Sequence, residues 1–579
     1  MAQKLAIAIS GAVSLGSYEA GVLYEVIEAI AQHNVHPDTS VDHRIEIDVI
    51  TGTSAGALTA CILAQKLMFE AEALRQPYAN ALYGAWVEDL GIAELLQLRG
   101  RDDPKFSIFS SEQIADLGYK YLLQRYAIGQ PTPRQRHPAV APRLKLGLGL
   151  SHLNGVDQEI EMTDFPDLTH LEYRSNRHFR YTRYADRFTC EICDHEMDDE
   201  PALWKTLERI ARASGTLPFA FRLLQLQPWS DDSIPRKSTL PQDPPGSFGY
   251  LDSGLFEHEP LGLAKTLVDE IDPQHLDHAD RFYLSVAPAA HNVHLPIRPD
   301  TATYLNLGAA LANAIRAQAG WQDWLATGQM NAAIRQFEQQ SKHLSDVLLK
   351  TPRLRLAFSQ VADPLLTALY ASALDSPQSE QGAEVAMQQD RSRLRQQFTE
   401  EYDRLVYGAE KKGEPGDAVA ESWLKLVQAL EKAQNLGDRD VMTVYAITSA
   451  GVELAGEQFF ALGGFLDQSF RESDYDWGRR QAVDFLEKLQ LLHGQGRGEG
   501  QLYLTNFVPG HNLDPAAPLS GRLDLSRVPL QTRQLIKAQL IDRLQHGVDA
   551  IESRFWVRWL LKFSLRLVLA KRLNQLLKL

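Results

Sequence analysis

Two apolar runs near the N-terminus, each followed by a turn of small residues and a helical stretch, restrict the possible folds most. Leu5–Ile9 has the length and apolar character of a fully buried strand, and Ile45–Ile50 is a second, mainly apolar run. Apolar residues recur at helical spacing from Tyr18 onward and again over Ala55–Met68. Strands that alternate with helices predict an α/β fold, with a largely parallel sheet and helices on both of its faces.

The chain is several times longer than an ordinary domain, and its later segments predict two parts. Further strand candidates are Leu144–Leu150, Phe282–Ala287, Met442–Ile447 and Leu502–Phe507. We expect a first domain, with the α/β fold, over residues 1–300. Long segments rich in Ala, Leu, Gln and Glu then predict a mainly helical C-terminal region over residues 301–579.

Composition and charge exclude several classes of protein. A hydrophobic content of 44% and a charged content of 23% are typical of globular proteins. Three cysteines in 579 residues make a disulfide framework implausible and favour a cytoplasmic location. No uncharged apolar stretch of about 20 residues is present, so we expect no membrane-spanning helix. The net charge of −15 argues against nucleic acid as a partner.

The strongest local motif is Gly52-Thr53-Ser54-Ala55-Gly56, a G-x-S-x-G sequence between a predicted strand and a predicted helix. Flanking glycines allow a sharp turn that exposes the serine hydroxyl beside the helix N-terminus. The motif alone is also compatible with a purely structural turn. Its position between strand and helix favours Ser54 as a nucleophile.

A serine nucleophile needs hydrogen-bond donors for the oxyanion that forms when it attacks an ester. The turn after the first strand, Ser10 to Gly16, contains small residues whose backbone N–H groups could face a ligand. It is a candidate oxyanion loop, although Gly-containing turns after strands are common in purely structural roles.

The nucleophile also needs a base. Tyr250-Leu251-Asp252-Ser253-Gly254 is an apolar approach to a carboxylate followed by a turn, and Asp252 could accept the Ser54 proton. Taken alone, Asp252-Ser253-Gly254 is more typical of an Asx turn than of a catalytic base.

In this order, the three elements resemble the patatin-like phospholipase family. Its pattern is a Gly-rich oxyanion loop, a G-x-S-x-G nucleophile and a late Asp-Gly-Gly or Asp-Gly-Ala aspartate. The segments that match are Ile9–Leu23, Ile50–Ala57, Ala213–Phe221 and Leu251–Pro260. The resemblance covers about residues 4–290. A further segment, Gly463–Arg480, resembles one in larger bacterial members.

The resemblance implies a three-layer α/β/α domain with a Ser-Asp dyad and no catalytic histidine. Ser54 would be the nucleophile and Asp252 its base, in surroundings desolvated enough to raise the pKa of the carboxyl. The N–H groups around Gly11, Ala12 and Val13, with that of Ala55, would form the oxyanion hole. The implied reaction is hydrolysis of a lipid ester, of phospholipase A or lysophospholipase type, without metal or organic cofactor.

Two departures from the family pattern leave an alternative open. The loop has Ala12 and Val13 where the family has glycines, and Leu15 where it has arginine. If those positions require positive φ, side chains there impose strain. Ser253 also replaces a glycine. A weakened or inactive domain that binds membrane or protein is therefore the alternative function.

Other residues have simpler interpretations. Only one strand precedes Ile45, which argues against an α/β-hydrolase triad with His258 as its third member. Cys190, Cys193 and His195 could supply three zinc ligands, but no fourth ligand is evident. We therefore expect no metal site.

The last 26 residues differ from the rest of the chain. Residues 554–579 contain seven Lys or Arg and no acidic residue, whereas the remainder has a net charge of −22. The basic residues Arg554, Arg558, Lys562 and Arg566 recur among aromatic and aliphatic ones, as in a basic amphipathic helix. We expect peripheral contact with the inner face of a membrane through this helix. Docking of its apolar side on the protein is the alternative, and the oligomeric state is not predicted.

Overall fold

The fold is that of a computed structural model, which describes most of the chain. The described residues are 2–127, 134–161, 178–194, 200–226, 248–255, 260–272, 281–288, 351–372, 380–411, 415–433, 442–449, 451–457, 461–494, 501–508 and 528–551, with scattered positions over 325–350, 510–526 and 562–577.

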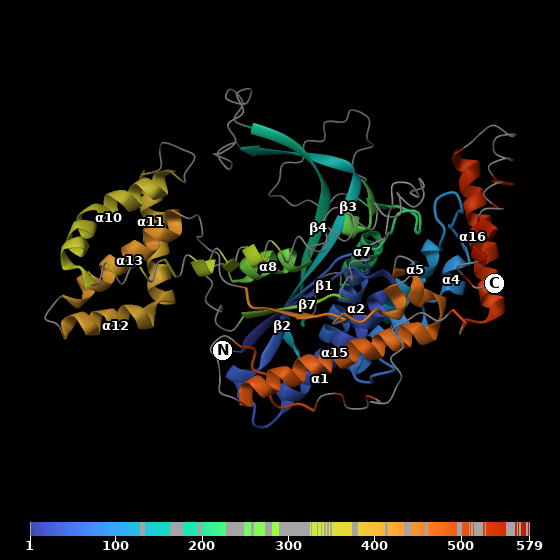
Figure 1. Cartoon of the computed structure of the whole chain (residues 1–579), viewed down its shortest axis with the longest axis horizontal. Helices are drawn as coiled ribbons and strands as arrows, with labels where there is room; N and C mark the ends of the chain where they lie inside the picture. The colour runs from blue at the N-terminus through green and yellow to red at the C-terminus, as the bar shows by residue number, and fades with distance from the viewer. Residues whose placement is uncertain are drawn as a thin grey trace. The chain divides into compact units, whose positions relative to one another are not determined.

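A mixed sheet of eight described strands organises the part of the chain that contains the motifs (Figure 1). Its strands are β1 (Gln3–Ile9), β2 (Ile45–Gly52), β3 (Val140–Glu161), β4 (His178–Cys193), β5 (Leu224–Leu226), β6 (Phe248–Leu251), β7 (Arg281–Val286) and β8 (Val444–Ile447). Their order is β5-β6-β3-β2-β1-β7-β8, and β4 pairs with β3 outside this path.

The centre of the sheet is parallel, as the alternating pattern predicts. β1 pairs in parallel with β2 and β7, β2 with β3, and β7 with β8. The pairs β3–β4, β3–β6 and β5–β6 are antiparallel. β1 and β7 are buried along almost their whole length and appear in the sequence as mainly apolar runs. β2 is buried to the same extent although it contains Glu46 and Asp48, and the buried Asp48 carboxylate accepts hydrogen bonds from Arg281 of β7.

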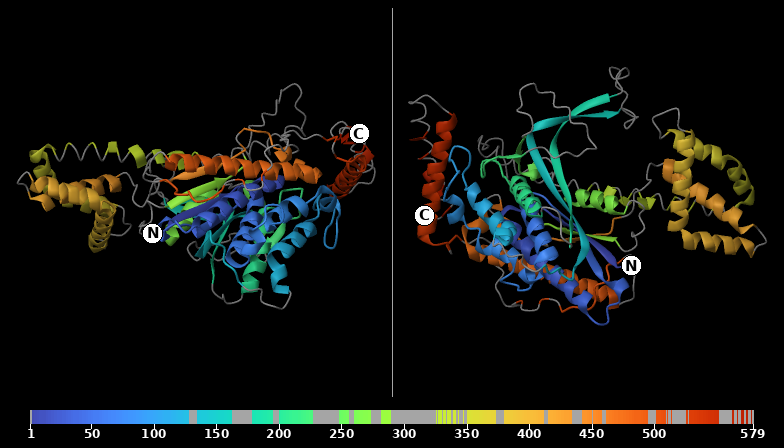
Figure 2. Two further views of the ribbon diagram at one scale, coloured as in Figure 1. Left: turned by 90° about the horizontal axis from the view of Figure 1, so that it is seen from below. Right: turned by 180° about the vertical axis from the view of Figure 1, so that it is seen from behind.

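Helices lie on both sides of the sheet and complete a three-layer α/β/α arrangement (Figure 2). The α-helices are α1 (Gly16–Val35), α2 (Ala55–Phe69), α3 (Ala81–Tyr83), α4 (Ile92–Leu96), α5 (Ser111–Gly118), α6 (Gln124–Ala127), α7 (Glu200–Ser214), α8 (Pro260–Ile271), α10 (Pro352–Ser372), α11 (Glu380–Gln397), α12 (Thr399–Glu410), α13 (Gly416–Ala433), α15 (Gln468–Gly494) and α16 (Leu530–Ile551). Short 3-10 turns include η1 (Val13–Leu15), η10 (Ala455–Glu457) and η11 (Gly463–Leu466). The predicted fold class is confirmed.

Two segments differ from the sequence-based expectation. β4 was not predicted, because its many charged and polar residues conceal it: it extends β3 as a long antiparallel hairpin. The segment Leu502–Phe507 was predicted as a strand but forms none. Its backbone N–H groups at Leu502 and Tyr503 instead donate to side chains, the Tyr445 hydroxyl at 3.1 Å and Gln3 Oε1 at 2.7 Å.

The chain forms two compact units, and each consists of segments that are separated in the sequence. The larger contains residues 1–268, 279–323 and 444–579, and the smaller contains residues 269–278 and 324–443. The expected boundary at residue 300 therefore does not separate the two units, because the chain returns after residue 443 to add β8 and α15 to the larger one.

The smaller unit is helical. In it α10 and α12 each pack on α13, and α11 packs on α10. A core that includes Tyr402, Trp423 and Leu424 holds α12 and α13 together.

No described helix is both long and apolar enough to cross a lipid bilayer.

Candidate active site

The predicted nucleophile lies on a sharp turn between β2 and α2. Ser54 has φ 53° and ψ −126°, a conformation that non-glycine residues rarely adopt. Its side chain is 5% exposed, and the first helical residue, Ala55, follows directly. The strained turn places the hydroxyl at the N-terminal end of α2.

The two glycines of the motif permit a close backbone approach. A Cβ at Gly52 would lie 2.3 Å from the carbonyl oxygen of Gly56. A Cβ at Gly56 would lie 2.5 Å from the carbonyl oxygens of Ile9 and Ser10, at the end of β1. The flanking glycines therefore bring the turn against the β1 end, where the candidate oxyanion loop begins.

The structure brings the predicted base into contact with the nucleophile. Ser54 Oγ donates a hydrogen bond of 3.0 Å to Asp252 Oδ2, although 198 residues separate them. Asp252 Oδ1 accepts the N–H of Gly254 at 2.8 Å, and the Asp252 N–H donates to the carbonyl of Thr216 at 2.9 Å. Asp252 is 5% exposed, so the carboxylate lies in the largely desolvated setting that the sequence analysis requires.

Two further serines support the turn, and the sequence analysis assigned no role to either. The backbone N–H of Ser54 donates to Ser214 Oγ at 2.9 Å and to Ser253 Oγ at 2.8 Å. Ser214 Oγ in turn donates to the carbonyl of Gly149 at 2.7 Å. Ser214 is the last residue of α7 and belongs to the small-residue stretch Ala213–Phe221, which was the available signal in the sequence. Its partner, Ser54, is 160 positions away.

The candidate oxyanion loop connects β1 to α1. Val13 has φ 53°, whereas Ala12 has φ −134°. A β-branched residue at positive φ costs about 1–3 kcal/mol. Gly11 and Ala12 are buried. Val13 and Ala55 line the same pocket as Ser54, so of the four predicted oxyanion residues these two lie at the site itself.

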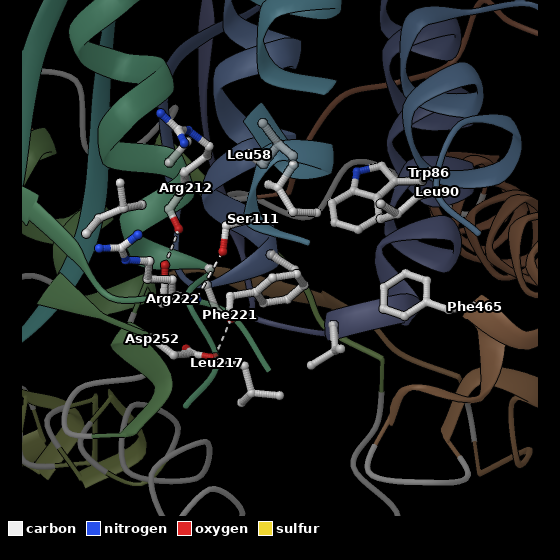
Figure 3. A pocket seen from close by; sticks show the side chains of 18 residues that line it. Leu58, Trp86, Leu90, Ser111, Arg212, Leu217, Phe221, Arg222, Asp252 and Phe465 are labelled. Carbon is white, nitrogen blue, oxygen red and sulfur yellow. Dashed lines mark hydrogen bonds between the residues drawn. The ribbon is translucent and has the colours of Figure 1, made fainter. Parts of the chain in front are cut away.

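The pocket beside the dyad is mostly apolar and has about 710 Å³ of space, including the part open to solvent (Figure 3). Leu58, Trp86, Leu90, Ile114, Leu217, Phe221, Leu224 and Phe465 are among its lining residues. Besides Asp252, its charged lining residues are Arg212 and Arg222. Such a pocket suits a hydrocarbon chain with a polar group at one end.

A comparison with known protein families identifies a match for the N-terminal part of the chain. The sequence model of the patatin-like phospholipase family matches residues 7–265. These residues form a patatin-like phospholipase domain. A search of curated proteins finds no match to the chain. The match of this domain implies lipid acyl hydrolase activity in general.

The patatin-like domain accommodates its departures from the family pattern in different ways. The strain anticipated for the loop is present at Val13 and absent at Ala12. Leu15, at the position of the family's arginine, is 5% exposed and packs in the core. Ser253, at a glycine position, supplies one of the hydroxyls that accept the Ser54 N–H.

The remaining candidates lie away from the dyad or outside the described residues. His195 and His258 are not described. Cys190 and Cys193 are on β4, and burial raises the pKa of the Cys190 thiol to about 12. Within the described part of the chain, no group of three His, Cys, Asp or Glu side chains is arranged to hold a metal ion.

Proposed function

We propose that this protein hydrolyses carboxylic esters of lipids, as a phospholipase A or lysophospholipase, with Ser54 as nucleophile and Asp252 as base. The observation that carries the proposal is the 3.0 Å hydrogen bond from Ser54 Oγ to Asp252 Oδ2 at the wall of an apolar pocket. A buried serine with a carboxylate acceptor and an adjacent apolar pocket supports acyl transfer better than a purely structural role.

The reaction would proceed in two steps. In the first, Ser54 Oγ attacks the ester carbonyl carbon while its proton moves to Asp252, and the N–H groups of Val13 and Ala55 receive the oxyanion. The tetrahedral intermediate collapses to an acyl-serine as Asp252 returns the proton to the departing alcohol. In the second step Asp252 takes a proton from water, which attacks the acyl carbon. The bond from that carbon to Ser54 Oγ then breaks as Asp252 returns the proton to Ser54 Oγ, which releases the fatty acid and restores the dyad.

The pocket supports a lipid acyl chain as the part of the substrate bound beside the dyad. The side chains of Leu58, Trp86, Phe221 and Phe465 all line the pocket (Figure 3). Binding of an acyl chain there would remove apolar surface of both the chain and the pocket from water, which stabilises the complex. The guanidinium groups of Arg212 and Arg222 could then meet an anionic headgroup.

Fatty-acid release from mixed phospholipid vesicles tests the proposal. The wild-type protein is compared with Ser54→Ala, with Asp252→Asn and with a control, Ser392→Ala, whose hydroxyl is exposed on α11. We expect both site variants to lose at least about 10³-fold in rate and the control to keep full activity.

The other outcomes separate the alternatives. Release that survives in Ser54→Ala contradicts the nucleophile assignment. If the folded wild type neither releases fatty acid nor reacts with a fluorophosphonate, the inactive binding domain is the better description, because only an activated serine reacts appreciably with that probe.

A further inference from the structure

A segment far outside the matched domain packs against the candidate oxyanion loop. η10, η11 and the first turns of α15 all contact η1, the turn that contains Val13. These elements span residues 455–480 and include the Gly463–Arg480 segment that the sequence analysis singled out. They belong to the same compact unit as the dyad.

Ser14, the residue after Val13, is the point of contact. Its Oγ accepts the N–H of Gly464 at 3.1 Å and donates to the carbonyl of Gly456 at 3.5 Å. A Cβ at Gly464 would lie 2.8 Å from Ser14 Oγ, and one at Gly456 would lie 2.6 Å from the Leu15 side chain. Glycines therefore allow both turns to approach the loop this closely.

Two buried charged residues of α15 hold these turns in place. Asp474 accepts the N–H groups of Ala455 and Gly456, both at 2.8 Å. Arg471 donates to the carbonyl of Gly464 at 3.0 Å and, through Nε, to the carbonyl of Val87 at 2.9 Å. Asp474 is 1% exposed and Arg471 is 3% exposed, so water does not compete for these bonds.

The same segment forms part of the pocket wall. Phe465 of η11 lines the pocket together with Val13 and Ser54 (Figure 3). Its neighbour Gly464 carries the bonds to both Ser14 and Arg471. Displacing η11 would therefore move the loop and the pocket wall together.

We propose that Asp474 and Arg471 are positioning residues that act through Ser14 to hold the Val13 N–H in place for the oxyanion. The inference rests on the proposed function, since it assumes that this N–H receives the oxyanion. A strained backbone such as that of Val13 persists only where surrounding contacts hold it in place. The turns η10 and η11 supply such contacts through their hydrogen bonds with the next residue, Ser14. Oxyanion stabilisation in turn depends on preorganised donors at close range.

The test compares Ser14→Ala and Asp474→Asn with a matched control, Tyr475→Phe. Tyr475 lies next to Asp474 on α15, and the control removes its hydroxyl. This hydroxyl forms hydrogen bonds with Asn80 and with the carbonyl of Pro77, and not with the loop. The measurements are kcat and KM for a short-chain p-nitrophenyl ester, with the thermal unfolding midpoint of each protein.

We expect Ser14→Ala and Asp474→Asn to lose at least about 10-fold in kcat with KM within about twofold of the wild type. Tyr475→Phe should keep the wild-type kcat even if its unfolding midpoint falls as far as those of Ser14→Ala and Asp474→Asn. If the folded Ser14→Ala and Asp474→Asn proteins keep the wild-type kcat, the inference is wrong while the proposed function stands. A wild type that does not turn over the ester, with a Ser54 that a fluorophosphonate does not label, refutes the proposed function itself and the inference with it.

Discussion

Val13 and Ser54 both have a φ of 53°, and both border the pocket. Among the described residues, the other non-glycine positions with positive φ are Phe219 and Ala461. Strain at Ser54 follows from the sharp turn that presents the nucleophile. Strain at Val13 has a different origin, because this loop position carries a side chain where the family has glycine.

At Val13 we expect a glycine variant to be more stable than an alanine variant, which is the reverse of the usual order. Replacing alanine by glycine normally lowers stability, but at positive φ glycine avoids the clash of Cβ with the backbone. Val13→Gly should therefore be more stable than Val13→Ala, by about 1 kcal/mol. Chemical denaturation of both variants measures the difference. A less stable Val13→Gly would show that the loop is not strained at this residue.

Asp474 gives a pH dependence of stability with a definite sign. Burial raises the pKa of its carboxyl to about 7, against the two backbone N–H groups that lower it, and Glu457 of η10 raises it further. Between about pH 4 and about pH 7 the native state therefore binds more protons here than the unfolded chain. The contribution of Asp474 to stability falls across this window, by up to about 4 kcal/mol, and is constant above it.

Asp474→Asn removes this titration. Relative to the wild type, the variant should gain stability as the pH rises from about 4 to about 7. It should also be less stable by a constant amount, because an amide has one acceptor oxygen and leaves one of the two backbone N–H groups without its partner. Urea denaturation of both proteins across that range measures the difference. Parallel stability curves would show that Asp474 titrates no differently in the folded and unfolded states.

The sequence predicts the two principal site residues because each has a local signature. Ser54 lies in a glycine-flanked motif, and Asp252 follows an apolar strand. Ser214 and Ser253 could not be assigned in this way. Their function depends on distance to the Ser54 N–H in the folded chain, and no spacing in the sequence encodes it.

At the scale of elements, the helices α1 and α15 lie side by side at very close range (Figure 1). A Cβ at Gly21 would lie 2.1 Å from the carbonyl oxygen of Tyr475, and one at Gly478 would lie 2.1 Å from that of Tyr18. Such contacts require glycine on each helix. The approach also places Arg479 Nε within 2.7 Å of Glu25 Oε1 in the buried interface.

We expect Gly478→Ala to destabilise the protein by several kcal/mol, because the added methyl group meets backbone that cannot move independently. Gly408→Ala is the matched control, since nothing lies within 4 Å of the Cβ that it adds to α12. Alanine there should raise stability by about 0.5–1 kcal/mol. The measurement is thermal unfolding of both variants. An unaffected Gly478→Ala would contradict the close packing of α1 on α15.

Strands and helices differ in how far the sequence predicts them. β1, β2, β7 and β8 are short apolar runs, so their predicted positions are close to the observed ones. β4 is rich in arginine and tyrosine and lies beside β3 without flanking apolar signals. The crossing of α1 and α15 could not be predicted either, because a single glycine within a helical pattern does not identify its partner.

At the scale of the whole molecule, the second half of the chain contributes to the unit that contains the site. β8 adds to the sheet edge at β7, and η10, η11 and α15 contact the candidate oxyanion loop. Composition alone suggests a separate helical region after residue 300. It could not show that the helical unit is an insertion, because the return of the chain to the sheet depends on contacts between distant residues.

The basic C-terminal segment remains the proposed contact with membranes, and only part of it lies within the described residues. There, Phe563 is 54% exposed and Arg566 is exposed, in agreement with an amphipathic surface. Near the end, Leu577 is buried, and its carbonyl accepts a hydrogen bond of 2.9 Å from Arg533 of α16. Leu577 therefore docks on the protein, while Phe563 and Arg566 could face a lipid surface.

We propose that this part binds anionic membranes, and the matched variants are Arg566→Glu and Arg187→Glu. The first reverses a charge on the segment, and the second reverses an exposed charge on β4. Since each basic residue near an anionic surface contributes about 1 kcal/mol, Arg566→Glu should weaken binding by roughly 10-fold or more. Co-sedimentation with vesicles of phosphatidylserine and phosphatidylcholine, at low and high salt, measures the effect. Equal losses in both variants would show that net charge alone governs binding, and no loss in Arg566→Glu would leave docking on the protein as the function of the whole segment.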